Sequence, residues 1–507
     1  MDHIGFVSLI PPIIAIILAI IFKNVIVSLF TGVFVGLLIM SNGNPITATT
    51  RTINEYITPQ FTDSYNAAVI VLLLFIGGFV ALVEKSGGGL ALANKAAKHL
   101  NSKRKTQLSA WFGGIVIFFS DMGTPLIIGP IFEKIFDKVK LSREKLAWII
   151  DSTSTPVAVL IPFIGWGVYI MGLIKEEFDR IGVATSEFTT FVHAIPFQFY
   201  AILSILIVPV VALTKVDFGA MSKANKRVEE TGALFWPDSK PLRKPEVSQE
   251  DTKESHPLLI LLPLGILFLT LFGLLLPQGF PFNPVPGSDF RVALSTGYLF
   301  ASVSLIILMI FYKVRKIGRI FDIYISGMQK MMHVILILVL AWALGSLLNE
   351  MGTAAYIIEL LEGNIAPWIV PMVIFAASSA MSFATGSSWG TFAIMLPLAI
   401  PMSYGLDAPL LVSIGAVLSG GIFGDHCSPI SDSTILASTG AGCDHVDHVK
   451  TQLPYALING LIALISFGIA GVTGSAYTIL FSIPLMVLTF FIISNIQTKR
   501  NGVNVTQ

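Results

Sequence analysis

Carboxylates interrupt two apolar segments of the chain beside prolines. Asp425 and Asp432 stand on either side of Pro429, and Asp151 lies five residues before Pro156. Ionisable groups inside membrane-spanning segments are energetically costly, so they are functional candidates by default. A proline disfavours helix in the residue before it and leaves backbone carbonyls free. Because hard cations take carboxylate, hydroxyl and carbonyl oxygens as ligands, this pattern predicts a sodium site held by Asp151, Asp425 and Asp432.

Other polar residues lie near these carboxylates or in a further interrupted segment. We expect the following to contribute to the same ion or substrate site: Asp121, Ser152, Thr153, Thr155, His426, Ser428 and Ser431. For Asp121 and Asp151 the alternative is a helix-end cap near the cytoplasm, and a single serine in a membrane helix more often bonds its own backbone. Burial in a low-dielectric site raises the pKa of a carboxylate, so one group can exchange a proton for a cation.

A second polar cluster contains His445, His448, Asp444 and Asp447. These residue types are common metal ligands. However, they directly precede the apolar run 455–470, where a cytoplasmic loop is expected. We therefore expect them to form the solvated start of a helix rather than a metal site.

The composition places most of the chain in lipid. Of 507 residues, 54% are hydrophobic and 12% charged, with a mean hydropathy of +0.78, whereas soluble domains carry about 25% charged residues.

The first apolar run lacks a basic flank and a cleavage site, so no signal peptide is expected. No Walker or dinucleotide motif occurs, which argues against an ATP-driven pump, and the chain is not expected to be an enzyme. Cys427 and Cys443 have neither disulfide-framework nor metal-finger spacing and are expected to be packed as small residues.

Runs of about 20 apolar residues are long enough to cross a bilayer as helices. The sequence contains eleven such runs: 5–22, 24–40, 66–83, 146–174, 190–213, 257–276, 293–312, 331–348, 408–424, 455–470 and 477–494. Two further stretches, 109–132 and 366–404, are apolar but interrupted by small polar residues.

The distribution of positive charge favours re-entrant hairpins for these two stretches. Six Lys and Arg residues precede the first stretch and five follow it, so a single crossing would place one cluster outside. The second stretch has no Lys or Arg between Lys330 and Lys450, which favours entry from the external side. The expected hairpin tips are Ser120, Gly123, Thr124, Thr385, Ser387, Ser388, Gly390 and Thr391.

Eleven crossings with two hairpins place 28 of the 32 Lys and Arg residues in the cytoplasm. The remaining four, Arg51, Lys175, Arg180 and Arg291, are then external. This arrangement predicts an external N-terminus and a cytoplasmic C-terminus in a multi-pass protein of the cell membrane.

The two hairpins match each other at a spacing of 267 residues. Both contain Ser-x-x-Gly-Thr, followed by a proline six residues later and another in the next span. The matched pairs are Ser120 and Ser387, Gly123 and Gly390, Thr124 and Thr391, Pro130 and Pro397, and Pro162 and Pro429. Five crossings separate the equivalent spans, so the two copies have opposite orientations. Inverted repeats with broken helices are typical of secondary transporters.

The fold class that follows is an all-α polytopic membrane protein with an inverted five-plus-five repeat and broken helices. We expect the first repeat over 1–214, a cytoplasmic linker over 215–255, the second repeat over 256–474, and an extra C-terminal helix and tail over 475–507. The charged linker is expected to be a solvated connector.

A family resemblance rests on two signatures. The run Gly424-Asp425-His426-Cys427-Ser428-Pro429-Ile430-Ser431-Asp432, with Asp447-His448-Val449-Lys450-Thr451-Gln452-Leu453-Pro454-Tyr455 downstream, resembles the NhaC-type sodium/proton antiporter family of the ion transporter superfamily. The segment Ala384-Thr385-Gly386-Ser387-Ser388-Trp389-Gly390-Thr391 is similar to a second signature of that family. The resemblance implies a plasma-membrane secondary transporter that uses sodium or proton gradients, with hairpins and broken helices holding the ions.

Relatives implied by this resemblance include sodium/proton antiporters, malate/lactate exchangers and sodium-coupled amino-acid carriers. Asp-His-Cys-Ser-Pro departs from the Gly-Asp-Asn/Lys-x-Ser-Pro form of some antiporters and organic-acid exchangers. Sodium/proton antiport is the first expectation, and sodium-coupled symport or exchange of a small amino or carboxylic acid is the alternative. A channel or a sensor is a more distant alternative.

The expected partners are sodium ions, protons and the bilayer, with a small organic anion or amino acid if the symport or exchange alternative holds. No cofactor or nucleic acid is expected, and a homodimer is compatible with this prediction.

Overall fold

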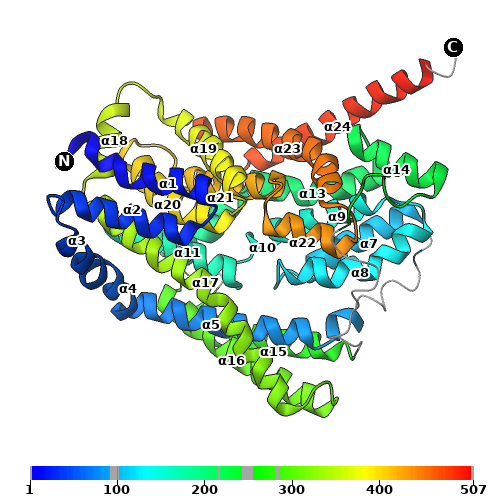
Figure 1. The fold of residues 1–507 in the computed structure, drawn as a ribbon, viewed down its shortest axis with the longest axis horizontal. Helices are drawn as coiled ribbons and strands as arrows, with labels where there is room; N and C mark the ends of the chain where they lie inside the picture. The colour runs from blue at the N-terminus through cyan, green and yellow to red at the C-terminus, as the bar shows by residue number, and fades with distance from the viewer. Residues whose placement is uncertain are drawn as a thin grey trace.

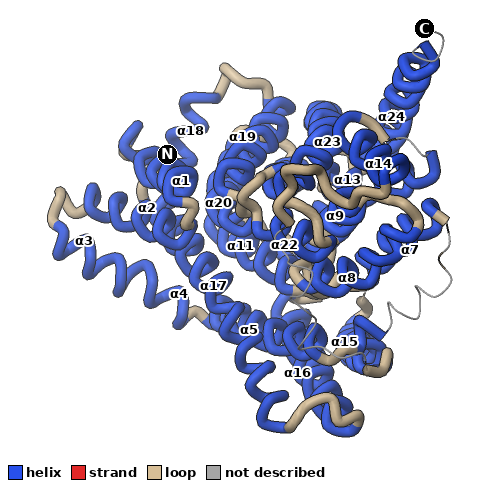
Figure 2. The backbone as a smooth tube through the Cα atoms, turned by 45° about the vertical axis from the view of Figure 1, so that its right-hand side comes forward, coloured by secondary structure: helices blue, strands red, loops and turns tan. Residues whose placement is uncertain are grey.

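The computed structural model describes residues 3–91, 100, 102–214, 217–241, 255–280 and 285–503. Within these ranges the chain is helical and contains no strand (Figures 1 and 2). The helices up to the linker are α1 (Ile10–Phe22), α2 (Val25–Met40), α3 (Pro45–Arg51), α4 (Thr58–Thr62), α5 (Ser64–Lys85), α7 (Lys103–Val116), α8 (Gly123–Lys138), α9 (Arg143–Thr153), α10 (Thr155–Ala158), α11 (Gly165–Ile181), α12 (Glu187–Ala194), α13 (Phe199–Thr214) and α14 (Gly219–Thr231).

The helices after the linker are generally longer. They are α15 (Leu258–Leu275), α16 (Gly287–Phe311), α17 (Ile317–Glu350), α18 (Thr353–Leu361), α19 (Val370–Thr385), α20 (Ser388–Gly405), α21 (Leu410–Cys427), α22 (Asp432–Ala441), α23 (His445–Thr473) and α24 (Thr478–Val503). Figure 1 shows α24 projecting from the body of the molecule toward the C-terminus.

Eight helical segments among the described residues are long and apolar enough to span a membrane, or nine if a bent pair counts as one span. The bent pair is Glu187–Phe197 with Phe199–Thr214, which meet at 50°. The chain is therefore a multi-span, all-helical membrane protein. Two further runs of the predicted eleven, 24–40 and 477–494, form the shorter apolar helices Val25–Met40 and Thr478–Ile493. The run 146–174 is not one helix but is divided among α9, α10 and α11.

Both interrupted stretches form a helix, a break and a second helix. Helices α7 and α8 are separated by residues 117–122, and α19 and α20 by residues 386–387. In each case the two helices pack against each other, as expected for a hairpin. By length and composition alone, Pro367–Thr385 also qualifies as a span.

The helices of the two halves keep a common register. Three pairs begin 267 residues apart: α7 at Lys103 and α19 at Val370, α9 at Arg143 and α21 at Leu410, and α11 at Gly165 and α22 at Asp432. Helices α8 and α20 end 267 residues apart, at Lys138 and Gly405. The prolines explain the shared breaks, because Pro162 and Pro429 fall between the two parts of each broken segment.

The matched motif makes the same hydrogen bonds in both hairpins. Ser120 Oγ accepts the backbone N–H of Gly123 at 2.8 Å, and Ser387 Oγ accepts that of Gly390 at 3.2 Å. The threonine that follows each glycine donates its hydroxyl to the carbonyl of the same serine, at 2.9 Å in each hairpin. Serine is a favoured N-cap because its oxygen satisfies an N–H that the first turn leaves free. The motif therefore makes the same two bonds in both hairpins, and in the second one Ser387 is the N-cap of α20.

Packing between the halves is reciprocal. Helix α22 packs on α8, and its counterpart α11 packs on α20, the counterpart of α8. Helices α5 and α17 lie side by side, with α16 beside α5 and α15 beside α16 (Figure 1). Gly77 and Gly327 allow the close approach of α5 and α17, since a Cβ on Gly327 would lie 2.2 Å from the Gly77 carbonyl oxygen.

The described part of the linker differs from the expected solvated connector. Helix α14 buries Met221, Ala224, Arg227 and Val228 against α9 and α23. Arg227 donates to both carboxylate oxygens of Glu144 at 2.9 and 3.1 Å. An amphipathic helix with its arginine on the apolar face explains this docking, because the guanidinium finds a buried carboxylate partner.

Candidate functional site

The break between α21 and α22 lies beside the end of α9. Thr434, in the first turn of α22, donates its hydroxyl to Asp151 Oδ2 at 3.2 Å and also lies 3.4 Å from the carbonyl oxygen of Asp425. This one side chain thus links the carboxylate of the first broken segment to the second broken segment. The structure brings Asp151 and Asp425, 274 residues apart in sequence, into one polar cluster.

Asp425 is buried in the last turn of α21 and is surrounded by hydroxyls. Its Oδ1 accepts from Ser431 Oγ at 2.7 Å, and its Oδ2 accepts from Ser433 Oγ at 3.0 Å. The break at Pro429 turns the chain so that both serines face the preceding helix end. Hydroxyl oxygens can bond the carboxylate and also ligate a hard cation next to it.

Asp151 is fully buried, and its neighbours all approach one oxygen. Its Oδ2 accepts from Gln452 Nε2 at 2.7 Å as well as from Thr434. His426 Nε2 and His448 Nε2 lie 3.8 and 3.5 Å from the same oxygen. The other oxygen, Oδ1, is buried and has no hydrogen-bond partner.

The imidazole and amide groups connect this cluster to two further helices. Tyr200 OH of α13 is 2.8 Å from His426 Nδ1, and Gln452 Nε2 of α23 donates to the His426 carbonyl. Helices α9, α13, α21, α22 and α23 therefore all contribute to the site. Sequence reasoning did not place Tyr200, Gln452 or Thr434 in it.

His448 corrects one expectation. Helix α23 begins at His445 as predicted, but His448 is fully buried beside Asp151 rather than solvated. His448 and Gln452 are four residues apart, so they lie on one face of α23. This four-residue spacing is the sequence signal that could have placed both residues in the site.

The remaining predicted residues of α9 and α10 are buried near Asp151 in sequence. Thr153 donates its hydroxyl to the carbonyl of Ile149 at 2.8 Å and is satisfied by its own helix. Ser152 Oγ and Thr155 Oγ1 are buried and have no hydrogen-bond partner. Together with Asp151 Oδ1, these atoms form a set of unsatisfied oxygens whose chemistry fits a hard cation.

Two predicted residues of the second break behave differently from each other. Ser428 Oγ donates to the carbonyl of Phe383 at 2.8 Å and so ties the break to the second hairpin. Asp432 is the first residue of α22, and its side chain is exposed. Among the contacts of the described residues, none joins Asp432 to Asp151 or Asp425.

The hairpin residues form contacts of their own. In the second hairpin, Ser388 Oγ lies 3.4 Å from the carbonyl of Gly421, and Thr385 donates to its own helix. In the first hairpin, Ser120 donates to Glu84 Oε1 at 2.6 Å. Asp121 Oδ2 accepts the indole N–H of Trp166 at 3.0 Å, so it belongs to a cluster separate from Asp151.

Trp166 joins the two hairpins. Its ring lies 4.0 Å from that of Trp389 between centroids, and Tyr169 donates its hydroxyl to the Trp389 carbonyl at 2.7 Å. The first turn of α11 therefore contacts the tip of the first hairpin through a hydrogen bond and the tip of the second through a tilted pair of aromatic rings.

The charge environment suits a light cation rather than a transition metal. In the described ranges no group of three or more His, Cys, Asp or Glu side chains has metal-holding geometry. In the same ranges, no Lys or Arg forms an ion pair with Asp151 or Asp425. The imidazoles of His426 and His448 balance the charge of Asp151 when they are protonated, whereas a buried carboxylate without such a partner requires a proton or another cation.

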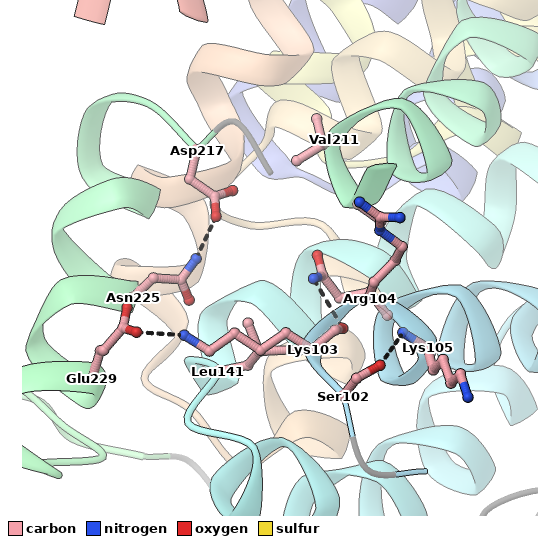
Figure 3. Close-up of a pocket in the computed structure, with 11 residues that line it drawn as sticks. Ser102, Lys103, Arg104, Lys105, Leu141, Val211, Asp217, Asn225 and Glu229 are labelled. Atoms are coloured by element: carbon pink, nitrogen blue, oxygen red, sulfur yellow. Dashed lines mark hydrogen bonds and ion pairs between the residues drawn. The ribbon is translucent and has the colours of Figure 1, made fainter. Parts of the chain in front are cut away.

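A cavity of about 690 Å³ lies elsewhere, between α7 and α14 (Figure 3). Lys103 Nζ crosses it to reach Glu229 Oε1 at 2.9 Å. Its lining residues are Ser102, Lys103, Arg104, Lys105, Gln107, Leu141, Val211, Ala212, Asp217, Asn225 and Glu229. None of the ion-site residues lines it, so this cavity and the ion site are different places.

Comparisons with known proteins agree with this architecture. An uncharacterized protein of Haemophilus influenzae is 32% identical over 486 residues, covering 92% of this chain and 91% of that protein. The malate-2H⁺/Na⁺-lactate antiporter of Bacillus subtilis is 35% identical over 147 residues, 29% of this chain and 31% of its own. The YdaH transporter structure from Alcanivorax borkumensis has a similar fold, with a TM-score of 0.55 at 16% identity over 85% of this chain and 89% of that one.

A family model supplies the assignment. The model of the Na⁺/H⁺ antiporter family matches residues 3–165 and 157–472, which together make up nearly the whole chain. This match agrees with the broken helices and the buried carboxylates described above. The chain is a membrane transporter that belongs to the Na⁺/H⁺ antiporter family.

Proposed function

We propose that this protein exchanges sodium ions for protons by alternating access, with the cation bound at Asp151 and Asp425. The observation that supports this most is the pair of buried carboxylates joined through Thr434 where two broken helices meet. Family membership supports coupling to sodium and protons. A carboxylate that binds either a sodium ion or a proton cannot hold both at once. One site is therefore enough to exchange the two ions.

The oxygen set favours sodium as the cation. Asp425 already has the hydroxyls of Ser431 and Ser433 on its two oxygens, and Asp151 presents a free oxygen in a buried site. We assign Asp432 a weaker role as an exposed carboxylate that attracts cations to the start of α22. All three predicted carboxylates then contribute to sodium transport, with Asp432 contributing least.

We also propose that the two halves are inverted repeats. The common register of helix starts and the reciprocal packing of α8 with α22 and α11 with α20 support this proposal. The positive-inside rule then places the N-terminus outside, the C-terminus inside, and both ends of the α7–α8 hairpin in the cytoplasm. Single cysteines at Lys105 and Arg143 are expected to react with an impermeant maleimide only from the cytoplasm. External labelling of either would contradict the re-entrant hairpin.

Coupled movement of a small amino or carboxylic acid is the second candidate. It is supported by the name of the Bacillus subtilis relative and by the two capped helix N-termini at the hairpin tips, which are suited to bind a carboxylate. In this case the organic anion would bind beside the sodium site, and protons would not compete with sodium.

Transport in proteoliposomes separates the two candidates. For antiport, an imposed sodium gradient drives proton movement without any organic substrate. Apparent sodium affinity weakens as the pH falls, by up to about tenfold per unit, because protons and sodium compete for one carboxylate. Asp151→Asn and Asp425→Asn are each expected to abolish this exchange, whereas Asp432→Asn reduces it less. Sodium-driven uptake of labelled acids with a pH-independent sodium affinity would instead support the second candidate.

A further inference from the structure

Gln452 occupies an unusual position in the ion site. Its side chain is 1% exposed, and its amide nitrogen donates to Asp151 Oδ2 at 2.7 Å and to the His426 carbonyl. Both partners are acceptors, so the amide orientation is set: the nitrogen, and not the oxygen, bonds them. One side chain of α23 therefore ties α9 to the end of α21.

The amide oxygen of Gln452 is left without a partner. Gln452 Oε1 is buried and accepts no hydrogen bond in the described structure, and the same is true of Asp151 Oδ1. Leaving a buried acceptor unsatisfied is energetically costly. Two such oxygens on hydrogen-bonded partners indicate a shared species that satisfies both.

A sodium ion satisfies both oxygens better than a further donor does. The ion takes carboxylate and amide carbonyl oxygens as ligands, whereas a histidine N–H could serve only one of them. The recorded approaches of His426 Nε2 and His448 Nε2 are to Asp151 Oδ2, at 3.8 and 3.5 Å, and neither ring nitrogen is hydrogen-bonded. The bonds on Oδ2 therefore fix the carboxylate and leave its other oxygen for the ion.

We propose that Gln452 is a sodium ligand as well as a positioning residue: its N–H groups hold Asp151, and its carbonyl oxygen coordinates the ion beside Asp151 Oδ1. This inference rests on the proposed sodium site. It adds a neutral oxygen ligand from α23 to the carboxylates of α9 and α21.

The test replaces Gln452 with methionine, which has a similar length but no N–H and no carbonyl oxygen. Sodium-dependent thermal stabilisation of detergent-purified protein and sodium-driven transport are both measured. We expect the half-saturating sodium concentration to rise by about 10- to 100-fold, the usual range when a residue supporting a metal site is lost. The ratio of sodium to lithium affinity is also expected to change, because removing a ligand alters the size of the coordination shell.

Asn459→Leu is the matched control. Asn459 lies two turns further along α23, is 2% exposed and also has an unpartnered amide oxygen, but it makes no described contact with Asp151. We expect its sodium affinity to stay within about twofold of wild type. If the methionine variant does not fold, Gln452→Asn retracts both amide atoms by one methylene and is expected to weaken sodium binding in the same direction.

The outcomes separate this inference from the proposed function. If Asp151→Asn abolishes sodium binding while both Gln452 variants keep wild-type affinity and ion ratio, the ligand assignment is wrong and the sodium site stands. If Asp151→Asn also leaves sodium binding unchanged, the sodium site itself is misplaced. A loss of affinity with an unchanged sodium-to-lithium ratio would reduce Gln452 to a positioning residue only and overturn its role as a ligand.

Discussion

The two hairpins share a backbone register but are held in different ways. In the second hairpin, α19 packs closely along the broken helix α21, and glycines let the backbones meet. A Cβ on Gly424 would lie 2.5 Å from the backbone nitrogen of Phe383, and Ser382 donates to the Gly421 carbonyl at 2.6 Å. In the first hairpin, α7 meets α9 less extensively, through Gly114 and the side chain of Thr153.

The hairpin tips differ in charge as well. The first tip bonds two carboxylates, Glu84 through Ser120 and Asp121 through Trp166, whereas Ser388 of the second tip lies beside the carboxylate of the ion site, Asp425. The second hairpin is thus fixed to α21, the helix that carries Asp425. The first hairpin packs on α22, the other half of the same broken segment, where Gly129 and Gly440 let the backbones meet, and its tip is bonded to α5 and α11. A repeated backbone motif is therefore anchored to different partners in the two halves.

The largest expected effect comes from wedging the second hairpin away from α21. Gly424→Ala places a methyl group against the backbone of α19, which cannot yield as a side chain can. Overpacking of this kind costs about 1–3 kcal/mol, and we expect the upper end. Thermal unfolding of the detergent-purified protein measures it.

Gly113→Ala is its matched control in the first hairpin. There the new Cβ would meet only the flexible end of Ile128, at 3.0 Å, and alanine is the better helix former. We expect unchanged or slightly higher stability. Equal destabilisation by the two substitutions would mean that the hairpins are held alike.

A smaller effect distinguishes the two capping serines. Ser387→Ala removes a helix cap, at about 1 kcal/mol. Ser120→Ala removes the equivalent bond to the Gly123 N–H and also the hydroxyl that donates to Glu84, so an additional cost of about 0.5–1.5 kcal/mol is expected. The difference in unfolding temperature between the two variants reports the extra bond. A larger loss for Ser387→Ala would reverse the comparison.

Much of this arrangement was predictable because it depends on local patterns. The Ser-x-x-Gly-Thr motif and the prolines mark where helices must stop and start, whatever surrounds them. Asp151 and Asp425 could be predicted because a carboxylate inside an apolar run stands out.

The other members of the site could not be found in this way. Tyr200 and Gln452 come from distant helices, and only the packing of α13 and α23 around α9 brings them to the site. His448 was placed in solvent because hydropathy marks the apolar run from residue 455, whereas α23 begins ten residues earlier, at His445. The mean hydropathy of a sequence window does not distinguish polar residues that neighbouring helices bury from polar residues of a loop.

The docked linker has a consequence for how the chain is made. Glu144 and Lys145 at the start of α9 are buried, and their partners Arg227 and Asp217 come from residues translated some 70 to 80 positions later. A buried charge without its partner costs about 3–5 kcal/mol. The helix that carries Asp151 therefore cannot adopt its final packing before Asp217 and Arg227 have been synthesised. The site is then expected to assemble only after α14 has left the ribosome.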